Sequence, residues 1–349
     1  MAIKPKKVAL IGAGMVADTH VTACCEAGDI ITLAGILSKS GTSAKKLADI
    51  AQQRTGKPVQ TYQHIDEIVS LSDCDFVIIT TPPNVRKDII APLAKAGKHI
   101  LLEKPIARTA EEARQIVTIC QDHNIMLGVV FQHRARQASQ HAKKIIAETD
   151  LGALGVVEMS VPWWREQSYY DEPGRGSYDR DGGGVLISQA IHTIDLALSL
   201  AGPVKSVIAM AQTSCFHEME AEDFVTAGLT FHNGAVGSLT ASTASFPGTA
   251  EAITLHFEKA SLHLEAGILT LSWRDGRIER FGAQAGTGGG ADPMAFTHEW
   301  HQAVIENFAR AIETQEPLLA SGADALAAHN LIEAITKSAN TKTEQDVLS

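Results

Sequence analysis

Two basic side chains, those of Lys104 and His192, occur where the surrounding residues favour a reactive position. Lys104 follows the apolar run 99–102, which predicts that it lies at the carboxyl end of a buried strand. His192 lies in an apolar segment with helical spacing that three glycines at 182–184 introduce. An ammonium and an imidazole that face one hydroxyl group can hold it and accept its proton. We therefore predict that both residues are catalytic, although a lone lysine is usually solvated and a lone helical histidine is usually structural.

Ser188 and Asp195 share the helical face of His192, because residues three and four positions apart are neighbours on a helix. We predict that both contribute, with His192, to substrate binding. A serine hydroxyl orients an imidazole without adding charge, whereas a carboxylate in its place raises the pKa of the imidazole. For Asp195 two interpretations stay open, a place in the pocket and a place on a solvated helix face.

An aromatic loop precedes this helix. Residues 162–178 contain half of the tryptophans and most of the tyrosines of the chain. Aromatic rings stack on the apolar faces of sugars, and arginine and tyrosine tips hydrogen-bond to sugar hydroxyls. We predict that Trp163 and Arg175 contact a substrate, together with Gln132 earlier in the chain. The alternative is that the loop fills an interface between subunits.

A glycine turn near the start of the sequence predicts a phosphate site. An apolar run leads into Gly12, Gly14 and Ala17 in a Gly-x-Gly-x-x-Ala pattern, and a helical pattern follows. Backbone N–H groups and the positive end of the helix dipole attract phosphate at such a turn. The alternative is an ordinary strand-to-helix turn. The predicted contacts to the pyrophosphate of a dinucleotide are Gly12, Gly14, Met15 and Val16.

Further cofactor contacts are expected where two later strands end. In the segment 80–86 two prolines stop a strand, and Asn84 precedes the next helix, which it would also suit as a cap. The other strand ends in Glu103-Lys104-Pro105, where the lysine is expected to reach the nicotinamide ring. The predicted cofactor contacts at these strand ends are Thr80, Thr81, Pro82, Asn84, Glu103 and Lys104.

The end of the second strand bears on the choice between NADP and NAD. An aspartate or glutamate there would bind the ribose hydroxyls and repel an extra phosphate. This chain has Ser38 and Lys39 instead, and a hydroxyl next to a cation suits the 2′-phosphate of NADP. We therefore predict NADP, bound through Ser38 and Lys39. The alternative is a solvated lysine with NAD bound through other groups.

The elements that position these residues fall into two regions. Up to residue 131, strand-like and helix-like segments alternate, which predicts an α/β protein with a parallel sheet that binds ligands at the carboxyl ends of its strands. From residue 132, strand-like runs dominate, and the turns 232–234 and 274–276 predict antiparallel hairpins. The predicted domains are a dinucleotide-binding Rossmann domain, 1–131, and a substrate-binding and oligomerisation domain, 132–349.

The second region has few helices to cover its sheet. One helix, the segment with His192, interrupts the strands, and a helical pair is expected at 296–312 and 323–338. One face of the sheet is then left for another subunit. We therefore expect a homodimer or homotetramer that forms through this sheet.

The sequence resembles the Gfo/Idh/MocA oxidoreductases, named for glucose–fructose oxidoreductase and inositol dehydrogenase. The resemblance lies in the glycine turn, the Thr81-Pro82 strand end, the Glu103-Lys104-Pro105 signature and the later Gly-Gly-Gly…His segment. The resemblance covers nearly the whole chain. It implies a Rossmann domain, a C-terminal α/β domain with a large, mostly antiparallel open sheet, NAD or NADP, and His192 as the partner of Lys104. Many members carry an aspartate one turn before the histidine, where this chain has Ser188, so the role of that aspartate does not carry over directly.

Together these predictions describe an NAD(P)-dependent oxidoreductase that transfers a hydride between a nicotinamide cofactor and a hydroxyl-bearing carbon of a sugar, an inositol-like polyol or a sugar derivative. Two alternatives stay open. One is an NAD-dependent glycoside hydrolase on the same scaffold. The other is a catalytically silent nicotinamide-binding sensor, which the presence of both Lys104 and His192 disfavours.

Charge and composition exclude several other classes. The net charge of −10 and the absence of a basic block argue against nucleic acid as a partner. No apolar run is long enough to span a membrane, and the polar, basic start predicts no signal peptide, so a cytoplasmic protein is expected. The five cysteines are odd in number and have no Cys-x-x-Cys spacing, which argues against a disulfide framework or a zinc site. The run 286–290 predicts a flexible loop, and the sequence leaves the roles of His298 and His301 open.

Overall fold

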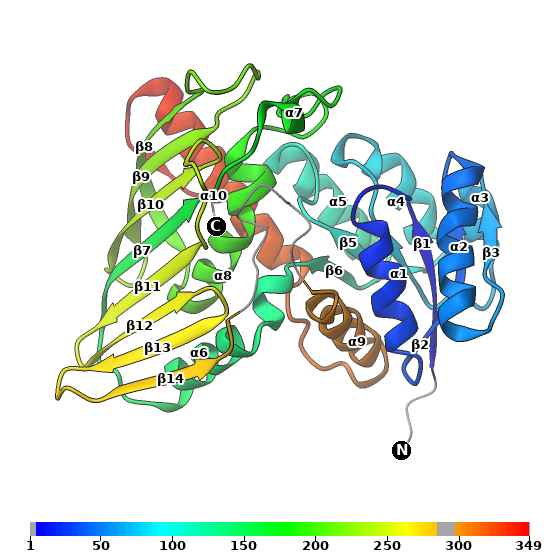
Figure 1. The fold of residues 1–349 in the computed structure, drawn as a ribbon, viewed down its shortest axis with the longest axis horizontal. Helices are drawn as coiled ribbons and strands as arrows, with labels where there is room; N and C mark the ends of the chain where they lie inside the picture. Colours follow the sequence, from blue (N-terminus) through cyan, green and yellow to red (C-terminus); the bar gives the residue numbers. More distant parts are fainter. Residues whose placement is uncertain (1–4, 285–296, 349) are drawn as a thin grey trace. The chain divides into compact units, whose positions relative to one another are not determined.

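A computed structural model describes residues 5–284 and 297–348 of the chain, and Figure 1 labels its helices and strands. The chain divides into two compact units. The first comprises Met1–Ala107, Glu111–Gln132 and His298–Ala323, and the second comprises Arg108–Ala110, His133–Thr297 and Asp324–Ser349. The predicted division after residue 131 lies one residue before the passage at Gln132–His133, and the chain also passes between the units at other points. The glycine run 286–290 lies outside the described residues.

The first unit is built on a six-stranded sheet with the order β3-β2-β1-β4-β5-β6, in which every pair is parallel. This order confirms the predicted Rossmann fold. Because the strands are parallel, the carboxyl ends of β1, β4 and β5 lie at one edge of the sheet. The strands are β1 Lys6–Ile11, β2 Ile31–Leu37, β3 Gln60–Tyr62, β4 Phe76–Ile79, β5 His99–Glu103 and β6 Leu127–Val130.

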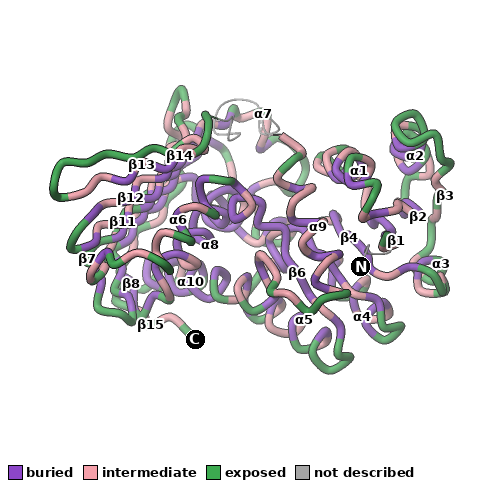
Figure 2. Tube along the Cα trace, turned by 90° about the horizontal axis from the view of Figure 1, so that it is seen from below, coloured by how far each residue is buried: buried purple, intermediate pink, exposed green. Residues whose placement is uncertain are grey.

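Helices cover both faces of this sheet. Figure 2 shows α1, α2 and α9 over one face and α4 and α5 over the other, with buried strands between them. The short α3 and the 3₁₀ turns η1 and η2 have no counterpart in the prediction. The helical elements are α1 Ala17–Glu26, α2 Gly41–Thr55, α3 Ile65–Val69, η1 Pro83–Val85, α4 Arg86–Lys95, α5 Ala110–Asp122, η2 Gln132–Ala135 and α9 Glu299–Thr314.

Helix α9 belongs to the first unit although it follows most of the second unit in sequence. Its Phe308 packs on Phe76 of β4 with the ring centroids 5.2 Å apart. After the helix, the carbonyl of Ala320 accepts a hydrogen bond of 3.0 Å from the N–H of Val129. The sequence predicts this helix as part of the C-terminal region because an amphipathic pattern shows that a face is buried but not which sheet buries it.

The second unit contains a nine-stranded sheet with the order β14-β13-β12-β11-β7-β10-β9-β8-β15. All pairs are antiparallel except β7 with β10, which confirms the predicted mostly antiparallel sheet. Both predicted hairpins form, with Gly234 and Gly276 at φ values of 90° and 93°. The strands are β7 Leu154–Pro162, β8 Val204–Gln212, β9 Phe224–Phe231, β10 Val236–Ser242, β11 Ala252–Phe257, β12 Ala260–Glu265, β13 Ile268–Trp273, β14 Ile278–Gly282 and β15 Gln345–Asp346.

The long helices of this unit lie on one face of its sheet (Figure 1). They are α6 Gln137–Glu148, α8 Ile191–Ala201 and α10 Gly322–Thr341, and the short α7, Gln167–Tyr170, lies in the aromatic loop. The strands alternate accordingly, since Leu239 and Ala241 of β10 are buried whereas Ser238 and Thr240 are exposed. None of the helices in residues 5–284 and 297–348 combines the length and the apolar character that crossing a bilayer needs.

Candidate active site

The loop between β1 and α1 forms an open cradle of backbone groups. Gly12 has a φ of 112°, and a Cβ at this position would lie 2.6 Å from Oγ1 of Thr80. A Cβ at Gly14 would meet nothing within 4 Å, and the next residue, Met15, is 54% exposed. Val16 completes the turn before the buried Ala17 opens α1. This open space at a helix N-terminus fits the pyrophosphate that the sequence predicts here.

The two glycines of the cradle are expected to respond differently to alanine. Gly12→Ala places a Cβ against Thr80 and strains the backbone, so it is expected to lower the free energy of unfolding by about 1–3 kcal/mol. Gly14→Ala is expected to leave stability unchanged and to weaken dinucleotide binding, because its methyl group enters the open space. Thermal unfolding without cofactor and fluorescence titration with NAD(P)H measure the two effects. Unchanged dinucleotide affinity in Gly14→Ala would contradict the predicted phosphate site.

Ser38 and Lys39 lie directly after β2, where the sequence predicts the cofactor-selecting contacts. The Ser38 hydroxyl accepts a hydrogen bond of 3.3 Å from the N–H of Ser40, and the Ser40 hydroxyl caps α2 through the N–H of Ser43. The Lys39 side chain is exposed, and no carboxylate stands in residues 37–40. A cation and a hydroxyl are thus the polar side chains at this strand end.

The end of β4 lies beside the end of β1. The N–H of Thr80 donates a hydrogen bond of 2.8 Å to the carbonyl of Ile11. Oγ1 of Thr81 is buried, and it has no hydrogen-bond partner within residues 5–284 and 297–348. Buried hydroxyls are normally satisfied, so this atom fits a polar group of a ligand at the predicted cofactor site.

Pro82 and Asn84 follow on the exposed side of this strand end. Pro82 is the N-cap of η1, and Asn84 lies exposed inside that turn. The N-cap of α4 is Val85, which makes no side-chain capping hydrogen bond. The interpretation of Asn84 as a helix cap is therefore wrong, and its predicted contact with the cofactor stays a prediction.

Arg86 fixes the segment that carries Lys104. Glu103 is the buried last residue of β5, and Lys104 follows it half-buried. The buried Arg86 guanidinium donates to the carbonyls of Thr81, Glu103 and Pro105. Burial lowers the pKa of Arg86 to about 10, against the opposing charge of Glu103. The ends of β4 and β5 are thus tied together by one side chain.

His20, Glu103 and His301 meet in the interior of the first unit. Nε2 of His20 lies 2.7 Å from Oε1 of Glu103, and Nε2 of His301 lies 3.7 Å from the same oxygen. These residue types also ligate metals, but a tetrahedral ion holds its ligand atoms about 3.3 Å apart. The contact between His20 and Glu103 is instead that of a hydrogen bond, and His301 lies at ion-pair distance from the same carboxylate.

Gln132 lies at the start of η2, after β6. It is buried, and its Oε1 has no hydrogen-bond partner in the described part of the chain. A buried amide oxygen that protein groups leave unsatisfied is suited to a ligand hydroxyl. The predicted role of Gln132 in substrate binding stays a prediction that this orphaned atom supports.

In the second unit His192 lies in the first turn of α8, and its ring stacks on that of His133. The ring centroids are 4.8 Å apart and the planes differ by 26°. Ser188 lies one turn earlier and is half-buried, inside the π-helical turn η3, Leu186–Ala190. Such turns are rare and occur often at functional sites. The sequence predicts a regular helix here, because an extra residue in one turn changes no composition signal.

Asp195, one turn after His192, forms a buried ion pair. It is fully buried and accepts two hydrogen bonds of 2.7 Å from Nε and Nη2 of Arg134, which also lies 3.3 Å from Asp324. Burial raises the pKa of Asp195 to about 7, against the opposing effect of Arg134. The interpretation of Asp195 as a solvated carboxylate is wrong. His133 stacks on His192, and the adjacent Arg134 pairs with Asp195. Both residues of α8 are therefore held by the turn η2.

The aromatic loop places cations over rings. The guanidinium carbons of Arg165 and Arg175 lie 5.7 and 4.8 Å from the ring centroid of Tyr169. Arg165 also lies 5.2 Å from the ring of Trp163, whose buried Nε1 has no hydrogen-bond partner among the described residues. Nε2 of Gln189 donates to the Tyr169 hydroxyl at 3.4 Å, which joins the loop to η3.

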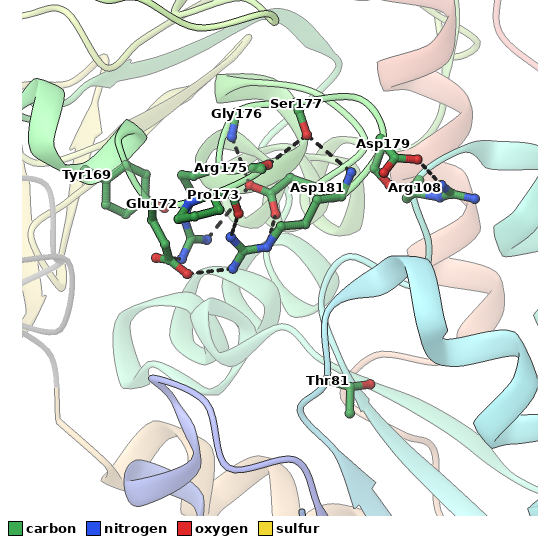
Figure 3. Close-up of polar contacts among 12 residues, drawn as sticks. Thr81, Arg108, Tyr169, Glu172, Pro173, Arg175, Gly176, Ser177, Asp179 and Asp181 are labelled. Carbon is green, nitrogen blue, oxygen red and sulfur yellow. Dashed lines mark hydrogen bonds and ion pairs between the residues drawn. The ribbon is translucent and has the colours of Figure 1, made fainter. Parts of the chain in front are cut away.

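An ion-pair network holds Arg175 in place. Its guanidinium donates a hydrogen bond of 2.8 Å to Glu172, which also accepts 2.7 Å from Arg180. Figure 3 shows Glu172 and Arg175 beside Tyr169, and Asp181 accepts a hydrogen bond from the N–H of Gly176. The loop is therefore held in shape by its own charges, in the way a preformed binding wall requires.

The sequence does not single out several residues that the tertiary structure brings to these sites. Arg86 and His133, for example, belong to no periodic pattern. Their roles depend on contacts with segments that are distant in sequence. The residues that sequence reasoning missed are His20, Arg86, His133, Arg134 and Gln189.

Two family descriptions match the chain. The one described as "Oxidoreductase family, NAD-binding Rossmann fold" matches residues 6–131, and the one described as "GFO/IDH/MocA C-terminal domain" matches residues 139–263. These two regions correspond to the parallel sheet and to much of the open sheet. The glycine turn and Thr81 both lie within residues 6–131, the NAD-binding match. The open space at Gly14 and the hydroxyl of Thr81, unsatisfied among the described residues, fit a nicotinamide dinucleotide.

The chain is also similar to named proteins. It is 28% identical to the rhizopine catabolism protein MocA of Rhizobium meliloti over 60% of this chain and 62% of that protein, so it spans less than two thirds of this relative. Inositol 2-dehydrogenase of Rhizobium meliloti (strain 1021) is 28% identical, over 95% of this chain and 96% of that protein. The crystal structure of the WlbA dehydrogenase from Bordetella pertussis in complex with NADH and UDP-GlcNAcA is 26% identical, with a TM-score of 0.81 over 99% of each chain.

Proposed function

Because the chain belongs to the Gfo/Idh/MocA family of NAD-binding oxidoreductases, we propose that it transfers a hydride between a nicotinamide cofactor and a hydroxyl-bearing carbon of a sugar, polyol or sugar derivative. The substrate class rests on one observation, the packing of the Arg165 and Arg175 guanidinium groups over the ring of Tyr169. A hydrogen bond from Gln189 to the Tyr169 hydroxyl joins this group to the helical segment that carries His192. Two of the similar proteins have a polyol in their name or a sugar derivative in their structure, which supports the same class.

In this proposal Lys104 and His192 hold the reacting hydroxyl, and one of them accepts its proton. Arg86 fixes the backbone on both sides of Lys104, and His133 fixes the plane of the His192 ring by stacking on it. Ser188 orients the ring of His192 without adding a charge. Asp195 contributes indirectly, through its ion pair with Arg134. Gln132 and Trp163 offer an acceptor and a donor to substrate hydroxyls, and the nicotinamide, when bound, supplies or takes the hydride.

The test is absorbance of reduced nicotinamide with the purified protein, NAD or NADP, and a panel of aldoses, inositols, sugar acids and nucleotide sugars. Reduction of the cofactor by at least one substrate is the expected result. Release of free sugar from a glycoside without net cofactor reduction would instead identify a glycoside hydrolase. Binding of the dinucleotide with neither outcome across the panel would favour a sensor and contradict the proposal.

We further propose that NADP is the preferred cofactor, because Lys39 and Ser38 suit a 2′-phosphate. Lys39→Gln is expected to raise the KM for NADP about ten- to hundred-fold, the value of a charge-assisted hydrogen bond, and to leave the KM for NAD unchanged. Lys46→Gln, which removes an exposed lysine of the neighbouring α2, is the matched control. A wild-type protein that reduces NAD alone would overturn the preference.

We also propose a homodimer or homotetramer that covers the open face of the nine-stranded sheet. Apolar side chains that strands β7, β8 and β10 present on this face are 38–59% exposed. Substituting lysine at two of them, Ile208 and Val236, is expected to convert the oligomer to monomer in sedimentation or light scattering, whereas Gln121→Lys on α5 is not. A wild-type monomer at micromolar concentration would contradict the proposal. The exposed apolar residues that β7, β8 and β10 present on this face are Val156, Ile208, Met210 and Val236.

A further inference from the structure

Three buried side chains from three elements of the first unit converge beside Lys104. His20 comes from α1, Glu103 ends β5, and His301 lies in α9. Their side chains are 0%, 8% and 1% exposed, in that order. A buried carboxylate needs hydrogen-bond donors and compensating charge to stay ionised, so this convergence of two imidazoles on one carboxylate calls for an explanation beyond packing.

Glu103 connects the two histidines to the backbone of Lys104. Its Oε1 contacts both imidazoles, and its Oε2 accepts a hydrogen bond of 3.1 Å from the N–H of Lys104. The carbonyl of the same Glu103 accepts from Arg86. The peptide that leads into Lys104 is therefore held on both sides, by the carboxylate at its N–H and by the guanidinium at the preceding carbonyl.

The electrostatics of the group link it to Lys104 as well. Burial alone would raise the pKa of Glu103, but the neighbouring His20 and His301 lower it well below its ordinary value. Burial lowers the pKa of His301, Glu103 opposes this, and the charges of His20 and Lys104 lower it further. The Glu103 carboxylate accepts a hydrogen bond from the N–H of Lys104, so its negative charge lies close to this residue. A negative charge close to an amine favours the ammonium form.

We infer that His20, Glu103 and His301 are positioning residues that fix the backbone of Lys104 and maintain a negative charge close to this lysine. Among the described residues, the charged or titratable groups packed around this segment include Glu103 of β5, Arg86 of α4 and the imidazoles of α1 and α9. The inference rests on the proposed function, because the positioned group is the proposed catalytic lysine.

The experiment measures the reactivity of Lys104 in protein without cofactor or substrate. Acetic anhydride modifies only the neutral amine, so mass spectrometry of the Lys104 peptide across pH 6 to 10 gives the midpoint at which this lysine loses its proton. Glu103→Gln removes the nearby negative charge and is expected to lower that midpoint by about one pH unit. His20→Ala acts in the same direction, because burial favours the neutral carboxyl once its donor is gone, whereas His20→Gln retains an N–H donor and is expected to restore the midpoint.

The matched control is His99→Ala. His99 lies at the other end of β5, where its Nδ1 accepts a hydrogen bond of 3.0 Å from the N–H of Met126, so this variant also loses an imidazole hydrogen bond of the first unit. It is expected to leave the Lys104 midpoint unchanged. An equal midpoint in wild type and folded Glu103→Gln would overturn the inference, as would an equal shift in His99→Ala.

A second measurement applies if the first variant does not fold. If Glu103→Gln fails to fold, the reciprocal measurement is made in Lys104→Met, where the midpoint of His301 in nitrogen-15 NMR is expected to rise because a nearby positive charge is gone. An unchanged His301 midpoint would then overturn the inference. Because neither measurement uses turnover, a shifted midpoint supports the positioning network even if the substrate panel contradicts the proposed function.

Discussion

Replacing Lys104 with methionine is expected to lower turnover by about a hundred- to ten-thousand-fold, the usual contribution of a positioned proton-transfer group. Methionine keeps the length of the side chain and removes its charge and its proton. The cradle at Gly12 and Gly14 is untouched, so the affinity for the dinucleotide is expected to stay close to that of the wild type. Steady-state absorbance of reduced nicotinamide gives turnover, and fluorescence titration with NAD(P)H gives the affinity.

Lys95→Met is the control for this substitution, because it removes an exposed lysine at the end of α4. Its turnover is expected to equal that of the wild type. If Lys104→Met retained near-full turnover, Lys104 would lose its catalytic role. If both turnover and dinucleotide affinity fell together, the lysine would be needed chiefly to bind the cofactor.

The second large effect is expected on stability. Arg134→Met leaves the fully buried Asp195 without the guanidinium that donates two hydrogen bonds to it. Removing one partner of a buried ion pair costs about 3–5 kcal/mol, because an uncompensated charge stays in the interior. Urea unfolding at pH 8 is expected to show a loss of this size in the free energy of unfolding. An exposed ion pair contributes at most about 1 kcal/mol to stability. A loss below this value would contradict the assignment of Arg134 and Asp195 as a buried ion pair.

The loss is expected to shrink as the pH falls. In Arg134→Met, burial raises the folded-state pKa of Asp195 above its ordinary value without opposition, so the folded chain takes up a proton that the unfolded chain lacks at neutral pH. The free energy of unfolding of the variant therefore rises relative to the wild type as the pH decreases from 8 toward 5. The double variant Arg134→Met with Asp195→Leu is expected to recover most of the stability, and Lys144→Met, from an exposed pair with Glu148, is expected to change little.

Local patterns were sufficient to predict the dinucleotide half of this protein. A strand, a glycine turn and a helix are contiguous in sequence, and the geometry of the Gly12 to Ala17 turn follows from residue types that tolerate close approach and positive φ. The hairpins at Gly234 and Gly276 are local for the same reason. The family resemblance depends on short motifs of this kind, and each of them is a contiguous run of residues, so the sequence alone is enough to establish it.

Contacts between distant segments were decided only by the tertiary structure. The packing of α9 on the parallel sheet, the stack of His133 on His192 and the pair of Arg134 with Asp195 each join residues that no periodic pattern relates. Asp195 looks like any carboxylate on a helix face until the fold buries it. The contacts of Glu103 with two imidazoles likewise form only when α1 and α9 pack beside β5. Periodicity reports that a face is buried, but the partner that buries it is chosen by packing over the whole chain.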